Sequence, residues 1–374
     1  MAYAQTLEGS FSGSTYHLAC AGMAAGKLEG TFSLYSASGS GRLVQARGAG
    51  WKLRRLLLAQ KSHGFKFTSE YLNPVWSRYI ESLAGTTLIN NFQLYGGEFF
   101  KRRRKLDISA YFYIDGTLAE YFESYSEFDV ANIDASTMAE AMKLETEGYQ
   151  EADGIVAMSR RTALNLQERY GIAPDKISIV PPGANLPDEA VESAQGRAFL
   201  PPDEEFVLGF VGLYPLRKGL DRLARAVQIL RGKGLRIRLR VIGNCPADLK
   251  AMEGLDYLGL INKKSDTAAF IEAISGVHMG CLLSRAELTG IAMLEFLRLG
   301  IPVVGTDVGG ATDILEGGGS VMVSPDISAE ELAEGLQEVY ENHALYEKLR
   351  GEAVSRRRWA SWTRVAEDLD GVLP

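Results

Sequence analysis

The chain has 374 residues, of which 46% are hydrophobic and 23% charged, and its formal net charge is −7. This length exceeds one ordinary hydrophobic core, so we expect a soluble globular protein with two domains. The acidic balance argues against a general nucleic-acid-binding protein.

Segments that would indicate export, membrane insertion or a metal site are not evident in the sequence. No run of 18 apolar residues and no basic region followed by an apolar core occurs, so neither a transmembrane helix nor a signal peptide is predicted. The three cysteines, Cys20, Cys245 and Cys281, are far apart and are expected to be reduced. No histidine stands at metal-ligand spacing from another histidine or a cysteine. These features predict a cytoplasmic protein without a metal.

In the first half, apolar runs of strand length alternate with amphipathic segments of helical period. A Gly/Ser-rich turn at 9–14 precedes an apolar helix at 16–23. Strands are then predicted at 32–35, 87–90, 110–114, 154–159 and 176–180, and helices at 139–152 and 160–170. The first strand, within 1–7, is short and poorly apolar.

The second half shows the same alternation more clearly. Strands are predicted at 206–212, 235–243, 255–260, 277–283 and 301–304, with helices opening at 218–219, 265 and 288. Each strand ends at glycine or a polar residue, which is typical of a doubly wound parallel sheet. The Pro-, Gly- and acid-rich stretch 182–202 is the predicted interdomain linker.

The most informative motif is a pair of glutamates, Glu287 and Glu295, eight positions apart. Residues 288–291 between them open a helix that ends at Gly300, where glycine can take the left-handed cap conformation. A helix N-terminus binds a diphosphate through its free N–H groups, and flanking carboxylates accept hydrogen bonds from sugar hydroxyls. The motif therefore predicts a nucleotide-diphosphate-sugar site. The alternative is a surface helix with a solvated Glu295 and a turn glutamate.

This segment, followed by an apolar strand and Gly309-Gly310, resembles the E-x7-E signature of the retaining GT-B glycosyltransferases of the group-one class (glycosyltransferase family four). The resemblance covers roughly residues 105–362. It implies an α/β fold of two Rossmann-like doubly wound domains that face each other across a cleft. Their expected bounds are 1–185 for the acceptor domain and 186–354 for the nucleotide-sugar donor domain, with a helix at 355–374 that crosses back to the first.

The resemblance also implies roles for individual residues. Glu287 would hold hydroxyls of the donor sugar, Glu295 the ribose, and the amides of 288–291 the diphosphate. Lys218, shortly after Gly212, is similar to the family lysine that neutralises the leaving group. The family usually has an arginine directly after that glycine, where this chain has Leu213, so either Arg217 reaches the phosphate or Lys218 carries the charge alone. The donor-binding residues implied are Gly13, Gly212, Arg217, Lys218, Asn244, Ile261, Glu287, Leu288, Thr289, Gly290, Ile291 and Glu295.

Four of the candidate residues rest on weaker patterns. Gly13 belongs to the Gly/Ser turn, which is similar to the family's first glycine loop. Asp115 follows a strand and would orient or deprotonate the acceptor, so we place it with Glu287 and Lys218 in the catalytic set. An ordinary Asp-Gly turn is an equal alternative for it. Asn244 and Ile261 would line the nucleotide pocket.

The leading hypothesis is a retaining, metal-independent glycosyltransferase that moves a sugar from a UDP- or GDP-sugar to an acceptor hydroxyl. The acceptor is a glycan, a lipid-linked saccharide or a small molecule. The alternatives are a sugar phosphorylase or nucleotide-sugar epimerase of the same fold, and a catalytically weak or inactive subunit that binds a nucleotide sugar or a partner transferase. Leu213 and the weak first strand favour that last alternative.

Two segments, 51–61 and 99–105, are both basic and apolar. Such segments can lie on an anionic membrane, so peripheral contact with its inner face is one interpretation. The alternative is a buried helix with solvated arginines and a charged loop.

Overall fold

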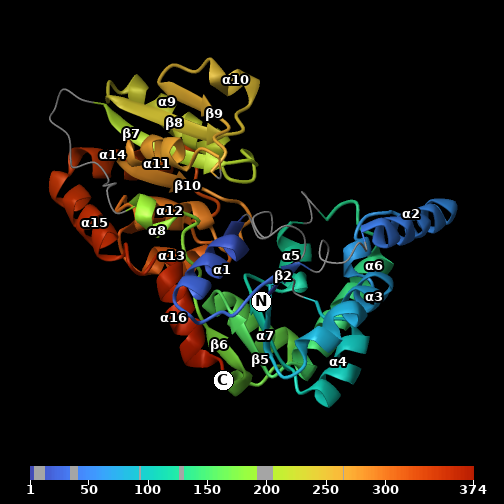
Figure 1. The fold of residues 1–374 in the computed structure, drawn as a ribbon. Helices are drawn as coiled ribbons and strands as arrows, with labels where there is room; N and C mark the ends of the chain where they lie inside the picture. Colours follow the sequence, from blue (N-terminus) through green and yellow to red (C-terminus); the bar gives the residue numbers. More distant parts are fainter. Residues whose placement is uncertain (4–12, 34–40, 92–93, 126–129, 192–204, 264) are drawn as a thin grey trace. The chain divides into compact units, whose positions relative to one another are not determined.

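The computed structural model describes residues 1–3, 13–33, 41–91, 94–125, 130–191, 205–263 and 265–374. The chain divides into two compact units, one of Met1–Pro181 with Val365–Pro374 and one of Pro182–Arg364. Both are α/β units with helices around a parallel sheet (Figure 1). Within the described residues, no helix has the length and apolar character needed to cross a membrane.

The sheet of the first unit has the strand order β2-β1-β3-β4-β5-β6 and is parallel throughout. Its strands are β1 (Ala2–Tyr3), β2 (Phe32–Ser33), β3 (Thr87–Asn90), β4 (Ser109–Ile114), β5 (Gly154–Ala157) and β6 (Ile177–Ile179). Its α-helices are α1 (Ser14–Ala24), α2 (Gly41–Leu57), α3 (Ser69–Tyr79), α4 (Gly97–Arg103), α5 (Leu118–Ser124), α6 (Ala135–Glu151), α7 (Arg160–Tyr170) and the end of α16 (Trp362–Val372). Short 3-10 turns are η2 (Phe65–Phe67), η3 (Ile80–Leu83), η4 (Arg104–Leu106) and η5 (Pro174–Lys176).

The core of the first unit is aromatic. Trp76 of α3 packs against the rings of Tyr95 and Phe99, each with a ring-centroid separation of 4.8 Å. Phe112 of β4 extends this cluster toward Tyr149 of α6. Offset and edge-on ring pairs of this kind add to the free energy of burial and fix how helices sit on the sheet.

The sheet of the second unit has the order β12-β11-β10-β7-β8-β9 and is also parallel. Its strands are β7 (Phe206–Gly212), β8 (Ile237–Gly243), β9 (Leu255–Gly259), β10 (Met279–Leu282), β11 (Val303–Thr306) and β12 (Ser320–Val323). Its helices are α8 (Asp188–Val191), α9 (Leu220–Gly232), α10 (Ala247–Lys250), α11 (Thr267–Ser275), α12 (Ile291–Arg298), α13 (Ala311–Glu316), α14 (Ala329–Glu341) and α15 (His343–Ser355).

Strand β7 shows how the sequence builds this layered unit. All of its residues are buried, and successive side chains point to opposite faces of the sheet. Phe206, Leu208 and Phe210 join the core formed with α9 and α14, whereas Val207 and Val211 join the core formed with α11, α12 and α13. The continuous apolar run 206–212 is therefore the sequence signature of a strand covered on both faces.

The chain order reverses at β7, because β8 and β9 lie on one side of it and β10, β11 and β12 on the other. In open α/β sheets, ligands bind at such a switch point, beyond the carboxyl ends of the strands. The two loops that border this position are 213–219 after β7 and 283–290 after β10. These loops contain Lys218 and Glu287.

The doubly wound fold predicted from the sequence is confirmed in both units. Several predicted bounds are displaced for local reasons. Helix α6 begins at Ala135 rather than 139, because the Asp134 side chain accepts a hydrogen bond from the Ser136 N–H and caps the helix there. The strand β12 and a group of helices were not predicted, namely α3, α4, α5, α8, α10, α13, α14 and α15. A helix within α2 was considered only as the alternative for 51–61. Residues 9–12 of the predicted Gly/Ser turn and most of the predicted linker, 192–202, lie outside the described residues.

A buried carboxyl group, that of Glu145 in α6, holds the start of α5 in the first unit. It accepts hydrogen bonds from the Leu118 N–H and the Tyr149 hydroxyl, both at 2.8 Å, and from the Tyr170 hydroxyl. Burial raises the pKa of Glu145 to about 7, although the hydrogen bonds that it accepts act in the opposite direction.

Replacing Glu145 with glutamine should flatten the pH dependence of stability. Between the ordinary pKa of 4.5 and about 7, the folded carboxyl holds a proton that the unfolded one has lost, so stability falls as pH rises through this window. The loss should be on the order of 3 kcal/mol. Urea unfolding at pH 5 and pH 8 measures it, with Glu147→Gln on the exposed face of α6 as control. An equal pH dependence in both variants would contradict the assignment.

Candidate functional site

The predicted glutamate Glu287 lies between two cations at the switch point of the second unit. Its Oε2 is 3.1 Å from Lys218 Nζ and 3.5 Å from Arg217 Nη1, and the Ser284 hydroxyl donates to it at 3.2 Å. The side chain is 10% exposed. Burial alone would raise the pKa of Glu287, but Lys218 and Arg217 together lower it below its usual value. The carboxylate is therefore ionised, and the cluster carries one net positive charge.

Arg217 ties the two loops together. It is buried, and its Nη1 donates to the Ala286 carbonyl at 2.6 Å, while its own carbonyl accepts from the Arg285 N–H at 2.7 Å. Its guanidinium also lies over the ring of Tyr214. These contacts hold the loop after β7 against the loop after β10, so Lys218 and Glu287 meet in a fixed geometry.

The stem of Lys218 runs across Gly212. A Cβ built on Gly212 would stand 2.6 Å from Lys218 Cδ, so a larger residue there would displace the lysine. The glycine at the end of β7 thus leaves room for the Lys218 stem.

Glu295, the second predicted glutamate, is inside the unit and only 1% exposed. Its Oε1 accepts from Lys263 Nζ, whereas its Oε2 is buried and has no hydrogen-bond partner among the described residues. An unpaired buried carboxylate oxygen carries a large desolvation cost, so such an atom in a folded protein calls for an explanation such as a missing ligand.

Helix α12 begins at Ile291, and Gly290 before it has a left-handed φ of 92°. Gly290 has no side chain with which to cap this end, and no side chain among the described residues accepts a hydrogen bond from the first N–H groups of the helix. Thr289 is buried, and its hydroxyl has no partner among the described residues. Leu288 is fixed by its carbonyl, which accepts from the Gly310 N–H at 2.8 Å.

Gly309 lets a second turn approach this loop. It has a φ of 55°, and a Cβ built on it would lie 1.8 Å from the Glu287 carbonyl oxygen. The Gly309-Gly310 turn after β11 therefore supports the backbone of Glu287 and Leu288 from behind. This position requires glycine for both conformation and space.

The other candidates of this unit are near the same edge of the sheet. Asn244 follows β8, and its side chain donates to the Leu213 carbonyl at 2.7 Å. Leu213 itself is exposed, so no cation occupies that position. Ile261 follows β9 and packs, half-buried, against the core that contains α11 and α12.

The remaining two candidates belong to the first unit. Asp115 is half-buried directly after β4, and its carbonyl accepts from the Thr162 hydroxyl at 3.1 Å. Gly13 is buried and precedes α1 with a φ of 101°. The rest of its predicted loop before Gly13 is outside the described residues.

Two residues of the site were not found by sequence reasoning. Ser284 stands three positions before Glu287, and this short spacing was a signal that could have identified it. Lys263 is 32 positions from Glu295 and meets it only through the fold, so no sequence spacing indicates it. Among the residues that the structure describes, no group of three or more His, Cys, Asp or Glu side chains is arranged to hold a metal ion.

Comparison with known proteins shows which proteins this chain resembles. Residues 192–356 match the family model described as glycosyl transferases group 1. The D-inositol 3-phosphate glycosyltransferase of Actinosynnema mirum is 28% identical over 243 residues, which are 60% of this chain and 58% of that protein. The chain thus spans between 52% and 58% of the length of the first curated relatives that it matches.

Solved structures share the fold of this chain and match most of its length. Sucrose-phosphate synthase from Thermosynechococcus elongatus has a TM-score of 0.62 at 17% identity and covers 83% of this chain and 78% of its own. Anabaena Alr3699/HepE, solved in complex with UDP and glucose, has a TM-score of 0.57 at 14% identity and covers 80% of each chain. At these identities the likeness establishes the fold alone, and the GT-B fold expected from the sequence is confirmed.

Replacing Gly309 with alanine should destabilise the second unit by about 1–3 kcal/mol, because the new Cβ meets a backbone oxygen and the backbone is left-handed. Gly335→Ala is the matched control, since it lies in α14 with nothing within 4 Å of a new Cβ and should be neutral or slightly stabilising. Urea unfolding of both variants measures the difference. Equal stabilities would show that the turn does not support Glu287 as described.

Proposed function

We propose that this chain is a group-one glycosyltransferase, and that it is a retaining, metal-independent enzyme that uses a UDP- or GDP-sugar. It moves the sugar to an acceptor hydroxyl on a glycan, a lipid-linked saccharide or a small molecule. The observation that carries the proposal is the pair of cations, Lys218 and Arg217, held at Glu287 beside the uncapped start of α12.

The difficult part of this reaction is the departure of a diphosphate from the anomeric carbon. The bond from that carbon to the diphosphate oxygen breaks, a bond to the acceptor oxygen forms on the same face, and the acceptor hydroxyl loses its proton. Lys218 and the α12 amides are placed to stabilise the charge that grows on the leaving group. Because fixed cations and dipoles supply this stabilisation, the proposed reaction requires no metal ion.

The two glutamates have separate roles in the proposal. Glu287 is held ionised by its cations and would accept hydrogen bonds from hydroxyls of the transferred sugar. Glu295 Oε2 is buried without a partner, which suits an acceptor for the ribose hydroxyls. Asp115 of the first unit remains our candidate for orienting or deprotonating the acceptor hydroxyl.

Arg217 supports an active transferase over a binding-only subunit. Leu213 leaves the family's usual arginine position uncharged, and that absence was the main argument for an inactive protein. However, Arg217 is buried at the same carboxylate as Lys218, so the site keeps a second cation. We infer that Arg217 supplies the charge that Leu213 does not.

The donor and acceptor are proposals of class only. UDP is the first nucleotide to test, because HepE was solved with UDP and glucose. The curated relatives are named for transfer to inositol 3-phosphate, but this chain spans little more than half of their length, so their acceptor is not carried over. We also propose a cytoplasmic location with peripheral contact to the inner face of the membrane.

Substituting the three central side chains should separate binding from turnover. Glu295→Ala and Lys218→Ala should weaken donor binding by roughly 1.5–3 kcal/mol each, because each removes a charge-assisted hydrogen bond. Glu287→Ala should mainly lower kcat. Donor titration and steady-state kinetics measure these effects, with the exposed Lys348→Ala as control. Full activity in all three variants would refute the site.

Arg217→Met should lower kcat/KM for the donor, since it removes one of two cations facing the diphosphate while keeping much of the buried volume. Adding Leu213→Arg to this variant should restore part of the loss, because it returns a cation to the end of β7. Kinetics of the single and double variants test the exchange. A loss that Leu213→Arg does not restore would show that Arg217 acts by holding the loop, and parental kinetics in Arg217→Met would contradict both roles.

The proposed function as a whole is tested by screening purified protein against UDP-, GDP- and ADP-sugars, in chelator and without added metal. Thermal stabilisation with slow release of nucleoside diphosphate is expected for one of them. Stabilisation by none of the nucleotides would overturn the donor site built on Glu287 and Glu295.

A further inference from the structure

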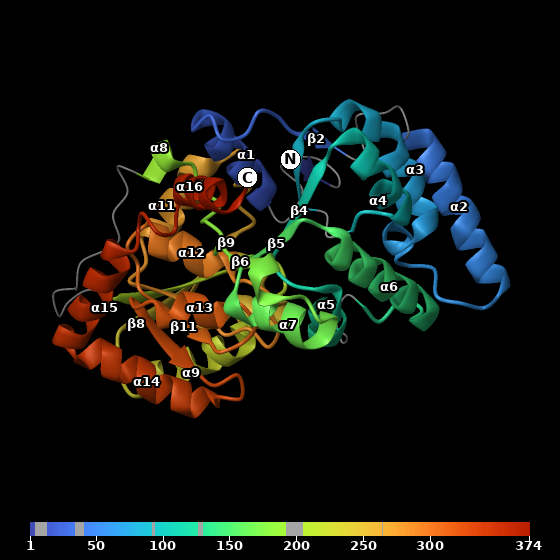
Figure 2. The same cartoon turned by 90° about the horizontal axis from the view of Figure 1, so that it is seen from below.

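Helix α2 presents an apolar surface to solvent, which is unusual for a helix of a soluble unit. Leu53, Leu56 and Leu57 are 58%, 71% and 78% exposed, and Leu58 directly after the helix is 68% exposed. The helix lies at the outer edge of the first unit beside α3 in both views (Figures 1 and 2). Large exposed apolar patches mark interaction sites on soluble proteins.

The exposed leucines form one continuous stripe. At 3.6 residues per turn, Leu53, Leu56 and Leu57 lie within about 120° of arc, together with the small exposed residues Ala46 and Ala49. The opposite side contains Gly48 and Trp51, which are both buried, and this side holds the helix on η2 and α3. The helix is therefore amphipathic, but its wider apolar face is turned away from the protein.

Basic residues flank the stripe on both sides. Arg47 lies along one border and Lys52 along the other, and both are exposed. Arg54, on the same border as Arg47, is exposed but pairs with Glu70 of α3. Residues 41–61 contain no acidic residue and six basic ones, in a chain whose net charge is −7: Arg42, Arg47, Lys52, Arg54, Arg55 and Lys61. This local charge is complementary to an anionic surface and opposite in sign to the chain as a whole.

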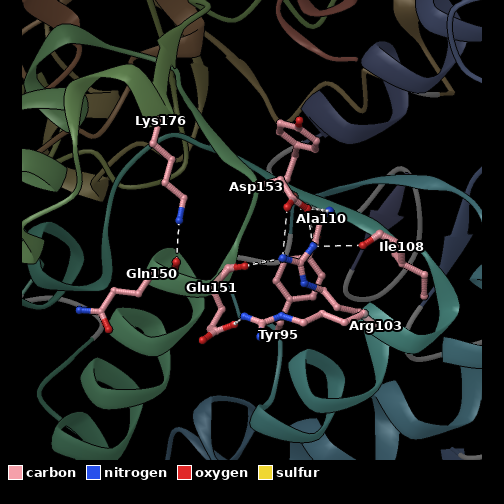
Figure 3. Close-up of polar contacts among 10 residues, drawn as sticks. Tyr95, Arg103, Ile108, Ala110, Gln150, Glu151, Asp153 and Lys176 are labelled. Atoms are coloured by element: carbon pink, nitrogen blue, oxygen red, sulfur yellow. Dashed lines mark hydrogen bonds and ion pairs between the residues drawn. The ribbon is translucent and has the colours of Figure 1, made fainter.

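The second basic and apolar segment, 99–105, is different. Phe99 and Phe100 are buried in the aromatic core, and the Arg103 guanidinium pairs with Asp153 at the start of β5 (Figure 3). The Arg104 guanidinium pairs with the Glu151 side chain, and the Glu151 carbonyl accepts a hydrogen bond from Arg103 Nη2. The structure favours the alternative given for this segment, because its two rings are core residues and Arg103 and Arg104 pair with acidic side chains.

We propose that α2 docks this protein on an anionic lipid surface, with Leu53, Leu56, Leu57 and Leu58 inserted below the headgroups. Arg47 and Lys52 would then contact lipid phosphates. A flat apolar stripe bordered by cations matches a helix lying in the plane of a membrane interface. The docking rests on α2 alone, whereas its use in transfer to a lipid-linked acceptor rests on the proposed function.

The test is co-sedimentation of the full chain with vesicles. Phosphatidylcholine vesicles should bind little protein, and vesicles with phosphatidylglycerol as about a third of the lipid should bind much more, with a loss at high salt. The triple variant Leu53→Gln/Leu56→Gln/Leu57→Gln should bind the anionic vesicles at least tenfold more weakly. Arg47→Gln/Lys52→Gln should weaken binding and reduce its salt dependence.

The matched control is Met23→Gln/Leu164→Gln/Ile179→Gln, which removes three exposed apolar side chains of the same unit outside α2. It should bind vesicles as the parent does, and circular dichroism and thermal unfolding should show all variants folded. Equal binding by the parent and the leucine variant would overturn the proposal. A dimer of the parent that the leucine variant converts to monomer, without vesicle binding, would also overturn it and assign the stripe to a second copy.

Donor hydrolysis by each variant, measured without vesicles, separates this inference from the proposed function. The leucine variant should keep parental hydrolysis, because α2 contributes no residue to the donor site. If the parent hydrolyses the donor but does not bind vesicles, only the docking is refuted. Vesicle binding without any hydrolysis or nucleotide binding would refute only the proposed function.

Discussion

The candidate site depends on one carboxylate that is held between two cations. Glu287 joins Lys218 and Arg217, and in doing so it joins the loop after β7 to the loop after β10. Neither loop has regular structure, so this cluster fixes their relative position. The sheet order makes the contact possible, because β7 and β10 are hydrogen-bonded neighbours in the sheet although residues 213–278 lie between the end of β7 and the start of β10.

Much of the fold could be predicted because burial on both sides leaves a plain signal. The runs 87–90 and 206–212 are strands with the bounds expected, since a parallel strand covered by helices must be apolar throughout. Helix α6 was placed four residues late because its start depends on one side chain, Asp134, and not on the apolar period. The short strand β12 is only half-buried, so its pattern is weak. Helix α2 was considered only as an alternative because its apolar residues face outward as well as inward.

The site could be predicted only in part. The spacing of Glu287 and Glu295 indicated a helix start between them, and the glycines before Lys218 and after β11 indicated tight loops. The partners of these glutamates could not be read in the same way. Arg217 is 70 positions from Glu287, and Lys263 is 32 positions from Glu295. Residues so far apart in the sequence meet only because of the strand order. Glu295 Oε2 has no hydrogen-bond partner among the described residues because of how the side chains pack, and no local sequence pattern indicates this.

The surplus positive charge around Glu287 would have a consequence for the proposed transfer reaction. A nucleoside diphosphate carries more negative charge than the sugar donor from which it is formed, so a fixed cationic cluster holds the product more strongly than the substrate. In the proposed reaction, the arrangement that eases departure of the leaving group would therefore also delay its escape from the protein. Turnover would then be paced by product release, and the free nucleotide level in the cell would act as a brake on transfer.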